Sequence, residues 1–117
     1  MALNNTSLDL MLDALAAVAV YVSAHDGDPS TTGINEHVVS TAPYARESIT
    51  WASSSAGNLN SSNTPVITIN DGDTVTHLGL WSAVTSGTFY GSADVVNEGP
   101  YGTDGTYTVT DFDVNIT

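Results

Sequence analysis

The sequence predicts a mainly β protein in which one N-terminal α-helix precedes an antiparallel β-sandwich. Three observations support this fold class. Near the N-terminus, apolar residues recur with the spacing of one helical face, whereas farther along the chain apolar and polar residues alternate over short segments. These segments recur about every ten residues and are separated by clusters of turn-forming residues. The chain has 117 residues, which is enough for one domain.

The first expected element is a helix that starts at a capping box. Thr6 is the expected N-cap residue, with Asp9 in the position that Glu usually occupies. The residues that follow the helical spacing are Leu8, Met11, Leu12, Leu15, Ala19 and Val22. We expect the helix to end within residues 23–27, where helix-breaking residues cluster. The predicted division of the chain is a helical segment over residues 1–27 and a sandwich domain over residues 28–117.

This helix is apolar around more of its circumference than packing on one sheet requires. Two interpretations remain open: the helix packs only on its own sheet, or it buries a second face against other copies of the chain. In the second interpretation the helix is an anchor and an oligomerisation element. The predicted interface residues are then Leu8, Met11, Leu12, Leu15, Val18 and Val22.

The rest of the chain is predicted to form strands between turns. Loops are expected at residues 28–43, with one short strand at 37–39 inside them, and at residues 57–63 and 97–105. The expected strands cover residues 46–54, 65–70, 74–83, 88–96 and 106–116. In the last of these, one regular alternation is expected to continue over the whole segment. Strands of this spacing are typical of an antiparallel sandwich or a small barrel, and we expect a sandwich with a jelly-roll or immunoglobulin-like arrangement.

The protein is strongly acidic, and its charge excludes several kinds of partner. Thirteen Asp and Glu residues stand against a single basic residue, Arg46, so the net charge is −12 at pH 7. Nucleic acids and anionic membranes are both bound through Lys and Arg, so we expect neither as a partner. No basic residue precedes Arg46, so we expect no signal peptide, and no apolar run is long enough to span a bilayer.

The absence of lysine favours a protein that works at high salt, as in a halophilic host. Self-repulsion between so many carboxylates destabilises a small domain at low salt. At molar salt the Debye length falls to about 3 Å, and most of this repulsion is screened. The alternative is an ordinary acidic extracellular module, which composition alone does not exclude.

Two Asp-Gly-Asp segments are the candidate metal sites. Asp26 and Asp28 flank one glycine, and Asp71 and Asp73 flank another, so each segment offers two carboxylates to Ca²⁺. Neither segment continues with the further acidic residues of a complete calcium loop. Asp-Gly is also ordinary turn chemistry, which is the alternative explanation for both segments. We expect no other cofactor.

No pattern in the chain predicts an enzyme. The histidines His25, His37 and His77 lack the spacing of metal ligands, and the chain contains no nucleophile elbow, phosphate-binding loop or dinucleotide fingerprint. Cysteine is absent, so thiol chemistry is excluded. Asp111 and Asp113 share a strand face that we expect to be solvated.

The aromatic residues suggest an alternative function, the stacking of sugars by a carbohydrate-binding module. Trp51 and Trp81 lie within alternating strands, however, and are expected in the core. Tyr101, in a glycine-rich loop, is the aromatic residue that we expect to be exposed. Arg46 is expected to pair with a carboxylate.

A series of short motifs, in order along nearly the whole chain, resembles a known family. The motifs are Met1-Ala2-Leu3-Asn4-Asn5, Met11-Leu12-Asp13-Ala14-Leu15, Gly27-Asp28-Pro29, Thr32-Gly33-Ile34-Asn35-Glu36, Tyr44-Ala45-Arg46, Ile49-Thr50-Trp51, Val75-Thr76-His77-Leu78-Gly79-Leu80-Trp81 and Gly87-Thr88-Phe89. Together they resemble short virion proteins of tailed double-stranded DNA viruses, described as tail-fibre or minor tail proteins. The family pattern contains more Lys and Arg, and their replacement here fits a virus of a halophilic archaeon. The resemblance implies no catalytic residues.

The residue pattern and the resemblance together predict a non-enzymatic structural protein of a virion. The expected locations are a tail fibre, a baseplate or a capsid decoration (turret), with assembly in the host cytoplasm and exposure on the particle surface. Expected partners are other virion proteins and further copies of the chain, as a trimer or pentamer, with a host-surface receptor as a further candidate. The alternative function is a calcium-stabilised carbohydrate-binding sandwich that recognises the host surface.

Overall fold

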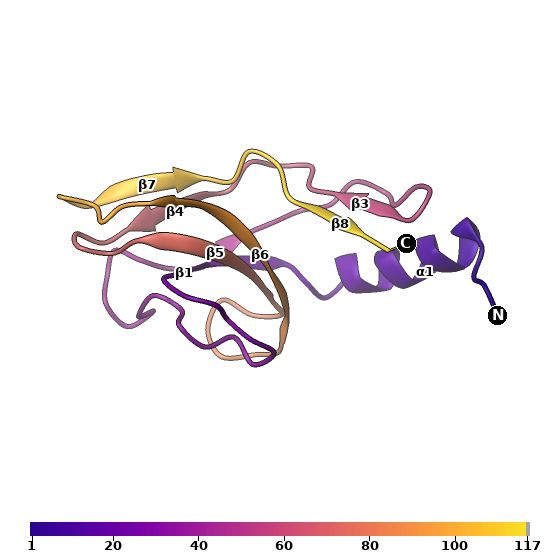
Figure 1. The fold of residues 1–117 in the computed structure, drawn as a ribbon, viewed down its shortest axis with the longest axis horizontal. Coiled ribbons are helices and arrows are strands. Elements are labelled where there is room, and N and C mark those ends of the chain that lie inside the picture. Colours follow the sequence, from indigo (N-terminus) through magenta and orange to yellow (C-terminus); the bar gives the residue numbers. More distant parts are fainter. Residues whose placement is uncertain (117) are drawn as a thin grey trace.

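The computed structural model describes residues 1–116 and shows an elongated molecule with its helix at one end (Figure 1). The dimensions are 49 × 24 × 20 Å and the radius of gyration is 14.6 Å, above the about 13 Å expected of a compact chain of this length. The elements are α1 (Asn5–Ala16), β1 (Tyr21–His25), β2 (Glu47–Ser48), β3 (Asn58–Asn60), β4 (Val66–Ile69), β5 (Val75–Trp81), β6 (Phe89–Glu98), β7 (Gly105–Thr108) and β8 (Asp113–Asn115). The predicted fold class, mainly β with one N-terminal helix, is confirmed.

The strands pair antiparallel in three sheets that pack together. The largest sheet has the order β2-β1-β5-β6, while β4 pairs with β7 and β3 pairs with β8. Apolar side chains from the large sheet and from β4 form one shared core, namely Val22, Ala24, Ile67, Ile69, Val75, Leu78 and Leu80. This arrangement of sheets around a common core is consistent with the predicted β-sandwich.

The helix is shorter than predicted, because the residues that follow it join the large sheet. α1 ends at Ala16, and the backbone N–H of Val20 already donates to the carbonyl of Trp81 (3.0 Å). Ala19 and Val22 have helical spacing, but both are fully buried in the sandwich core. Pairing of all five residues of β1 with β5, together with this burial, outweighs the weak helical preference of a short apolar run. The predicted helix end within residues 23–27 is therefore wrong.

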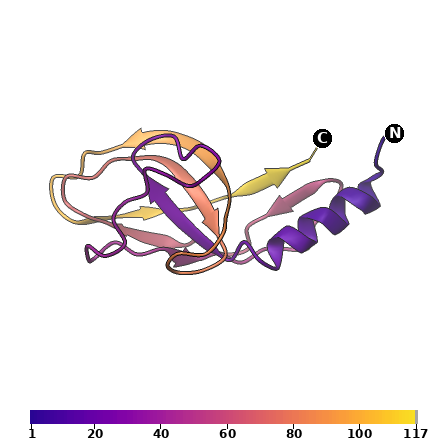
Figure 2. The same ribbon diagram turned by 90° about the horizontal axis from the view of Figure 1, so that it is seen from below.

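The helix also starts two residues earlier than predicted, with Asn4 rather than Thr6 as its N-cap residue. The Asn4 side-chain oxygen accepts a hydrogen bond from the backbone N–H of Ser7 (3.0 Å). Asn is among the best N-cap residues, so it displaces a weaker candidate two positions later. α1 contacts β3, and one side chain of each element, Leu12 and Leu59, is buried. Figure 2 shows α1 extending away from the large sheet, beside β3.

The central strands are confirmed, whereas the segments around them were harder to predict. The strands expected at residues 65–70, 74–83 and 88–96 are β4, β5 and β6. No strand forms at residues 37–39. The preceding residue, Glu36, makes a single antiparallel β-bridge with His25. Of the strand expected at 46–54 only β2 is regular, and β3 lies within a segment expected to be a loop. Strands of two or three residues carry too few side chains to show an alternation.

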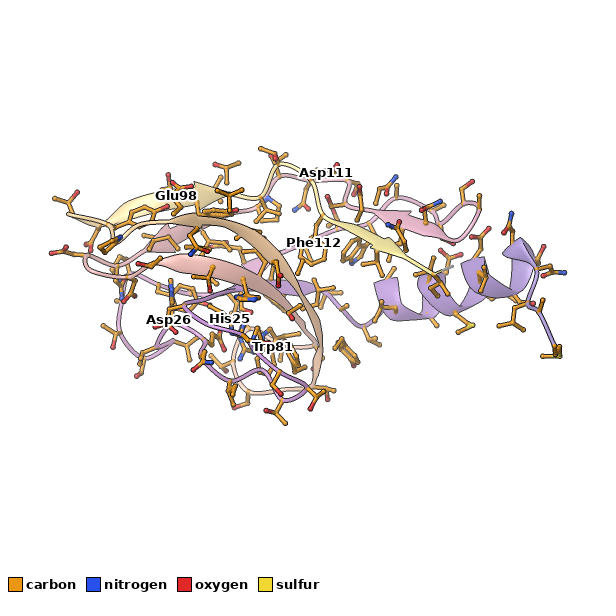
Figure 3. All side chains as sticks on the ribbon, in the orientation of Figure 1. His25, Asp26, Trp81, Glu98, Asp111 and Phe112 are labelled. Carbon is orange, nitrogen blue, oxygen red and sulfur yellow. The ribbon has the colours of Figure 1, made fainter. Side chains whose placement is uncertain are left out.

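The last predicted strand is divided in two by a change of face. β7 ends at Thr108 and β8 begins at Asp113. Val109 and Phe112 are both buried, although a regular alternation places them on opposite faces. Phe112 points inward in Figure 3, and Asp111 lies on the outside. The break lets the chain pair first with β4 in the sandwich and then with β3 beside the helix.

Candidate functional site

The first candidate site is the side of the helix that faces away from the sandwich. We call it the α1 outer face, and it consists of Leu10, Met11, Ala14, Ala17 and Val18. The exposed fractions of Leu10, Met11 and Val18 are 68%, 51% and 42%. An apolar surface of this kind on a soluble domain is typical of an interaction site.

The α1 outer face carries no charge, because both charged residues of the helix are turned toward a neighbouring loop. The carboxylate of Asp9 accepts a hydrogen bond from the backbone N–H of Gly57 (2.8 Å), and that of Asp13 accepts one from Ser54 (3.1 Å). Hydrogen bonds with the side chain and the backbone of Ser54 lower the pKa of Asp13 below its ordinary value of 3.8. The two carboxylates thus fasten the helix to the loop and leave its outer face apolar.

The structure divides the six predicted interface residues into three groups. Met11 and Val18 lie on the α1 outer face, and Leu8 and Leu15 are half-buried. Leu12 and Val22 are buried within the chain itself, so their assignment to an interface is wrong. Leu10 was missed because it does not belong to the apolar face with the helical spacing. Of that face, Leu12 is buried and Leu8 and Leu15 are half-buried, and α1 contacts the protein's own β3.

The only basic side chain, Arg46, lies inside the protein. Its guanidinium makes a two-pronged ion pair with Glu36 (2.8 Å for each bond) and donates to the backbone carbonyls of Ala83 (2.9 Å) and Ser86 (2.7 Å). It also lies 3.7 Å from the centre of the Trp81 ring, which is a cation–π contact. The expectation that Arg46 pairs with a carboxylate is confirmed. These contacts hold two long loops against the large sheet.

A serine and a histidine meet beside this ion pair. The Ser23 hydroxyl lies 2.7 Å from Nε2 of His25, while Nδ1 of His25 lies 2.9 Å from the carbonyl oxygen of Ile34. A carbonyl only accepts, so Nδ1 carries the proton and Nε2 accepts from the serine. The indole N–H of Trp81 donates to the same hydroxyl (2.8 Å). Burial lowers the pKa of His25, which keeps the ring neutral.

This pair has the geometry of a nucleophile and base, but neither residue is exposed to solvent (0% for both). No substrate reaches the hydroxyl, so the pair serves the interior packing. The signal in the sequence was the spacing of Ser23 and His25, which places them on one strand face. Gly79 lies opposite, and a Cβ there would come within 2.6 Å of the hydroxyl. The glycine therefore provides the room for this hydrogen bond.

The second candidate site is a pocket of about 190 Å³ at the end of the sandwich away from α1. We call it the acidic pocket, and it is lined by Asp26, Glu36, His37, Val38, Thr41, Asn70, Asp71 and Asp73. Figure 3 shows Asp26 at this end of the molecule. The structure thus brings together three of the four predicted calcium ligands, from two distant segments. Asp28 is not among them, because its side chain accepts from the backbone of Ser30 (2.8 Å) in a turn.

The acidic pocket is not assembled as a metal centre. Within residues 1–116, no three His, Asp or Glu side chains are placed so that they could hold a metal ion. The carboxylate of Glu36 already pairs with the guanidinium of Arg46 and accepts a hydrogen bond from the hydroxyl of Tyr44 (2.8 Å). The structure therefore leaves the calcium hypothesis without a complete ligand set.

Among residues 1–116, every aromatic side chain except Tyr90 (39% exposed) is buried or half-buried, which leaves little aromatic surface for stacking sugars. Tyr44 and Trp81 are buried, as expected for core residues, and Trp51 is half-buried. Tyr101, expected to be exposed, is also half-buried, because its ring packs over Gly105. Its hydroxyl donates to Glu98 (3.0 Å), and burial with this hydrogen bond raises its pKa to about 12.

Comparison with known proteins gives the family. Among the described residues 1–116, no helix has the length and apolarity needed to cross a membrane. A search of the curated proteins finds no match to the chain. The family described as podophage GP4 fiber I protein gp80 matches residues 1–117, which is the whole sequence. The chain belongs to this family and is a fibre-type structural protein of a tailed-phage virion.

Proposed function

We propose that the protein assembles as a symmetric homo-oligomer, a trimer or pentamer, through the α1 outer face. The observation that carries the proposal is a charge-free apolar face on a chain with a net charge of −12. Like-charged surfaces repel one another, so copies of this chain associate most readily where carboxylates are absent. In the assembly the sandwich projects outward and the helix lies at the centre.

The geometry of the face suits packing between helices. Met11 and Ala14 are three residues apart within α1, which is the spacing of neighbouring positions in a coiled-coil seam, and Val18 follows in the turn after the helix. The small side chain of Ala14 lets two helix backbones approach closely. α1 is already fixed on β3 through its buried Leu12, so its order is established before the copies meet. A preformed surface lowers the entropy cost of association.

The family assignment supports a place in the virion, and symmetric repetition is the ordinary way in which one short chain builds a particle component. Tail fibre is the location that fits the family description, and we infer exposure on the particle surface from the outward acidic faces. We further infer that the protein is adapted to high salt, because molar salt screens the repulsion between its carboxylates. The carbohydrate-binding alternative is not adopted, since the described aromatic residues form no exposed row.

Light scattering coupled to size-exclusion chromatography tests the assembly at about 2 M and about 0.1 M salt, where screening differs most. We expect a trimer or pentamer at high salt that loosens at low salt. Leu10→Asp and Met11→Asp should give folded monomers, because each places a charge on the α1 outer face. Leu12→Asp is unsuitable, since Leu12 is buried inside the protein.

Val96→Asp is the matched control, because Val96 is 91% exposed on β6 and lies outside the α1 outer face. It should leave the oligomer unchanged, and circular dichroism should show the same fold for all variants. A protein that is monomeric at both salt concentrations would contradict the proposal. So would full assembly of the Leu10→Asp and Met11→Asp variants.

A further inference from the structure

We propose that the acidic pocket binds an arginine side chain presented by a different protein of the particle. The pocket holds three carboxylates that no basic residue of the chain neutralises. Asp26 and Asp71 form no ion pair with any residue in 1–116, and Asp73 faces only His37. The position of His37 within this group is the second and independent observation.

His37 is buried, with its side chain 1% exposed, and one of its ring nitrogens has no hydrogen-bond partner. Nε2 lies 2.9 Å from the backbone carbonyl of Thr74, so Nε2 carries a proton. Nδ1 lies 3.8 Å from a carboxylate oxygen of Asp73, too far for a hydrogen bond. In the neutral ring Nδ1 is an acceptor that faces another acceptor. Within residues 1–116 this acceptor has no donor.

The walls that hold this acceptor group are rigid. The ring of His37 packs edge-on against Tyr44 (5.3 Å between centroids). The Asn70 side chain accepts from the backbone of Tyr44 (3.0 Å) and donates to the carbonyl of Thr41 (2.8 Å). The backbone N–H of Asp71 is fixed by the carboxylate of Asp104 (2.8 Å). The carboxylates of Asp71 and Asp73 therefore stand on a turn whose backbone is already determined.

The arrangement favours an organic cation over a metal ion. The acidic side chains surround an opening of about 190 Å³ and do not converge on one point. A guanidinium spreads five N–H donors over a planar fork, which suits several separated acceptors. A metal ion needs its ligands at little more than 2 Å. The charge of the pocket also selects against neutral or acidic partners.

A second copy of this chain is excluded as the source of the arginine. The sequence contains no lysine, and its single arginine is held inside the protein by Glu36 and Trp81. The partner must therefore be a different protein with an exposed arginine. The turn between β4 and β5, which carries Asp71 and Asp73 of the acidic pocket, lies at the opposite end from α1 (Figure 1), so this contact and the proposed oligomer can fail separately.

Nuclear magnetic resonance of the full chain tests the proposal with three blocked tripeptides, Gly-Arg-Gly, Gly-Lys-Gly and Gly-citrulline-Gly, at about 0.1 M salt. We expect the arginine peptide to shift the signals of residues 36–41 and 70–73 and of the His37 ring in a saturable way. Citrulline has the same shape without the charge, so its peptide should bind about tenfold more weakly or worse. The lysine peptide should lie between them, because it lacks the planar fork.

Two variants and one control assign the binding to the pocket. Asp71→Asn and Asp73→Asn each remove one pocket carboxylate and should weaken the arginine peptide about tenfold. Asp94→Asn is the control, since Asp94 is 91% exposed and pairs with His77 on the sheet surface (2.9 Å). It removes the same charge and should leave the affinity unchanged.

Four outcomes would overturn the proposal. Equal weakening by Asp94→Asn, or equal binding of the citrulline peptide, would show unspecific attraction. A ring proton on Nδ1 of His37 at neutral pH, with no peptide shifts, would show that His37 itself neutralises the pocket. Saturable broadening of the His37 signals by Mn²⁺, without peptide binding, would identify a metal site instead.

Discussion

The two ends of the molecule use polar groups in opposite ways. At the α1 end, the carboxylates of Asp9 and Asp13 are satisfied by backbone N–H groups, and the surface left over is apolar. At the other end, Asp26 and Asp71 form no ion pair within residues 1–116, Asp73 faces only His37, and all three line a pocket. Under the two proposals, the first end meets copies of the chain, whereas the second binds a cation from a different protein.

This difference depends on where the single arginine is placed. Arg46 neutralises Glu36 in the interior and leaves no cation for the surface. The buried guanidinium is stabilised by two hydrogen bonds to Glu36, two hydrogen bonds to backbone carbonyls and a cation–π contact with Trp81. Because the chain has a single arginine and no lysine, burial of that arginine leaves the charged groups of the surface predominantly acidic.

The largest expected effect is the loss of this internal cation. Arg46→Met should lower the free energy of unfolding by about 3–5 kcal/mol, because it leaves the largely buried Glu36 carboxylate without its counter-ion. The double variant Arg46→Met/Glu36→Gln removes both charges and should recover part of the loss. Denaturant unfolding monitored by tryptophan fluorescence measures both. A change below about 1 kcal/mol in the single variant would contradict the internal role, since surface pairs contribute that little.

The two faces of α1 should respond very differently to the same deletion. Leu12→Ala should cost about 2–5 kcal/mol, because it opens a cavity between the helix and the sandwich. Leu10→Ala, two residues earlier and 68% exposed, should change the stability of the monomer by no more than about 0.5 kcal/mol. Unfolding is best measured at a low protein concentration, where association does not contribute. Similar losses in the two variants would mean that the outer face packs on the chain itself.

The smallest effect concerns two carboxylates with opposite pKa shifts. Hydrogen bonds with Ser54 lower the pKa of Asp13, so its stabilising contribution is present above pH 3.8 and is lost as the pH falls through the lowered value. Desolvation and the neighbouring Asp111 raise the pKa of Asp113, so its ionised form destabilises the fold at neutral pH. Asp13→Asn should therefore lower stability at pH 7 and Asp113→Asn should raise it.

Both differences should shrink as the pH falls through the two shifted pKa values and the carboxyls become protonated. Urea midpoints at pH 7 and pH 2 measure them, and carboxyl carbon chemical shifts give the two titrations directly. Changes in the urea midpoint of the same sign for the two variants at pH 7 would contradict the assigned hydrogen bonds.

The sequence predicted the parts of the fold that have a local pattern. The strands β4, β5 and β6 were found because they alternate over enough residues, and the helix was found because its apolar face repeats. The end of the helix was missed, because the apolar run over residues 14–22 continues past Ala16 into β1. The pairing of β1 with β5, more than fifty residues later, decides the outcome. A local sequence pattern does not show which distant segment a strand will pair with.

The candidate sites show the same limit. The sequence indicated four aspartates as one class of site, but it did not reveal that Asp26 lies beside Asp71 and Asp73 while Asp28 closes a turn. It also gave no reason to select His37, whose importance comes from burial and from one unpaired ring nitrogen. Likewise, helical spacing identified an apolar helix but assigned Leu12 to the wrong face.

The amino-acid sequence by itself determined the charge of −12, the absence of catalytic motifs, the fold class and the positions of the central strands along the chain. Composition and short-range periodicity are enough for these properties, because each depends on residues that are close in the chain. Only the tertiary structure decided which face of α1 is exposed, that Arg46 lies inside, and that an acidic pocket forms at the far end. Burial and electrostatic environment depend on contacts between distant segments, and these exist only once the sheets have packed.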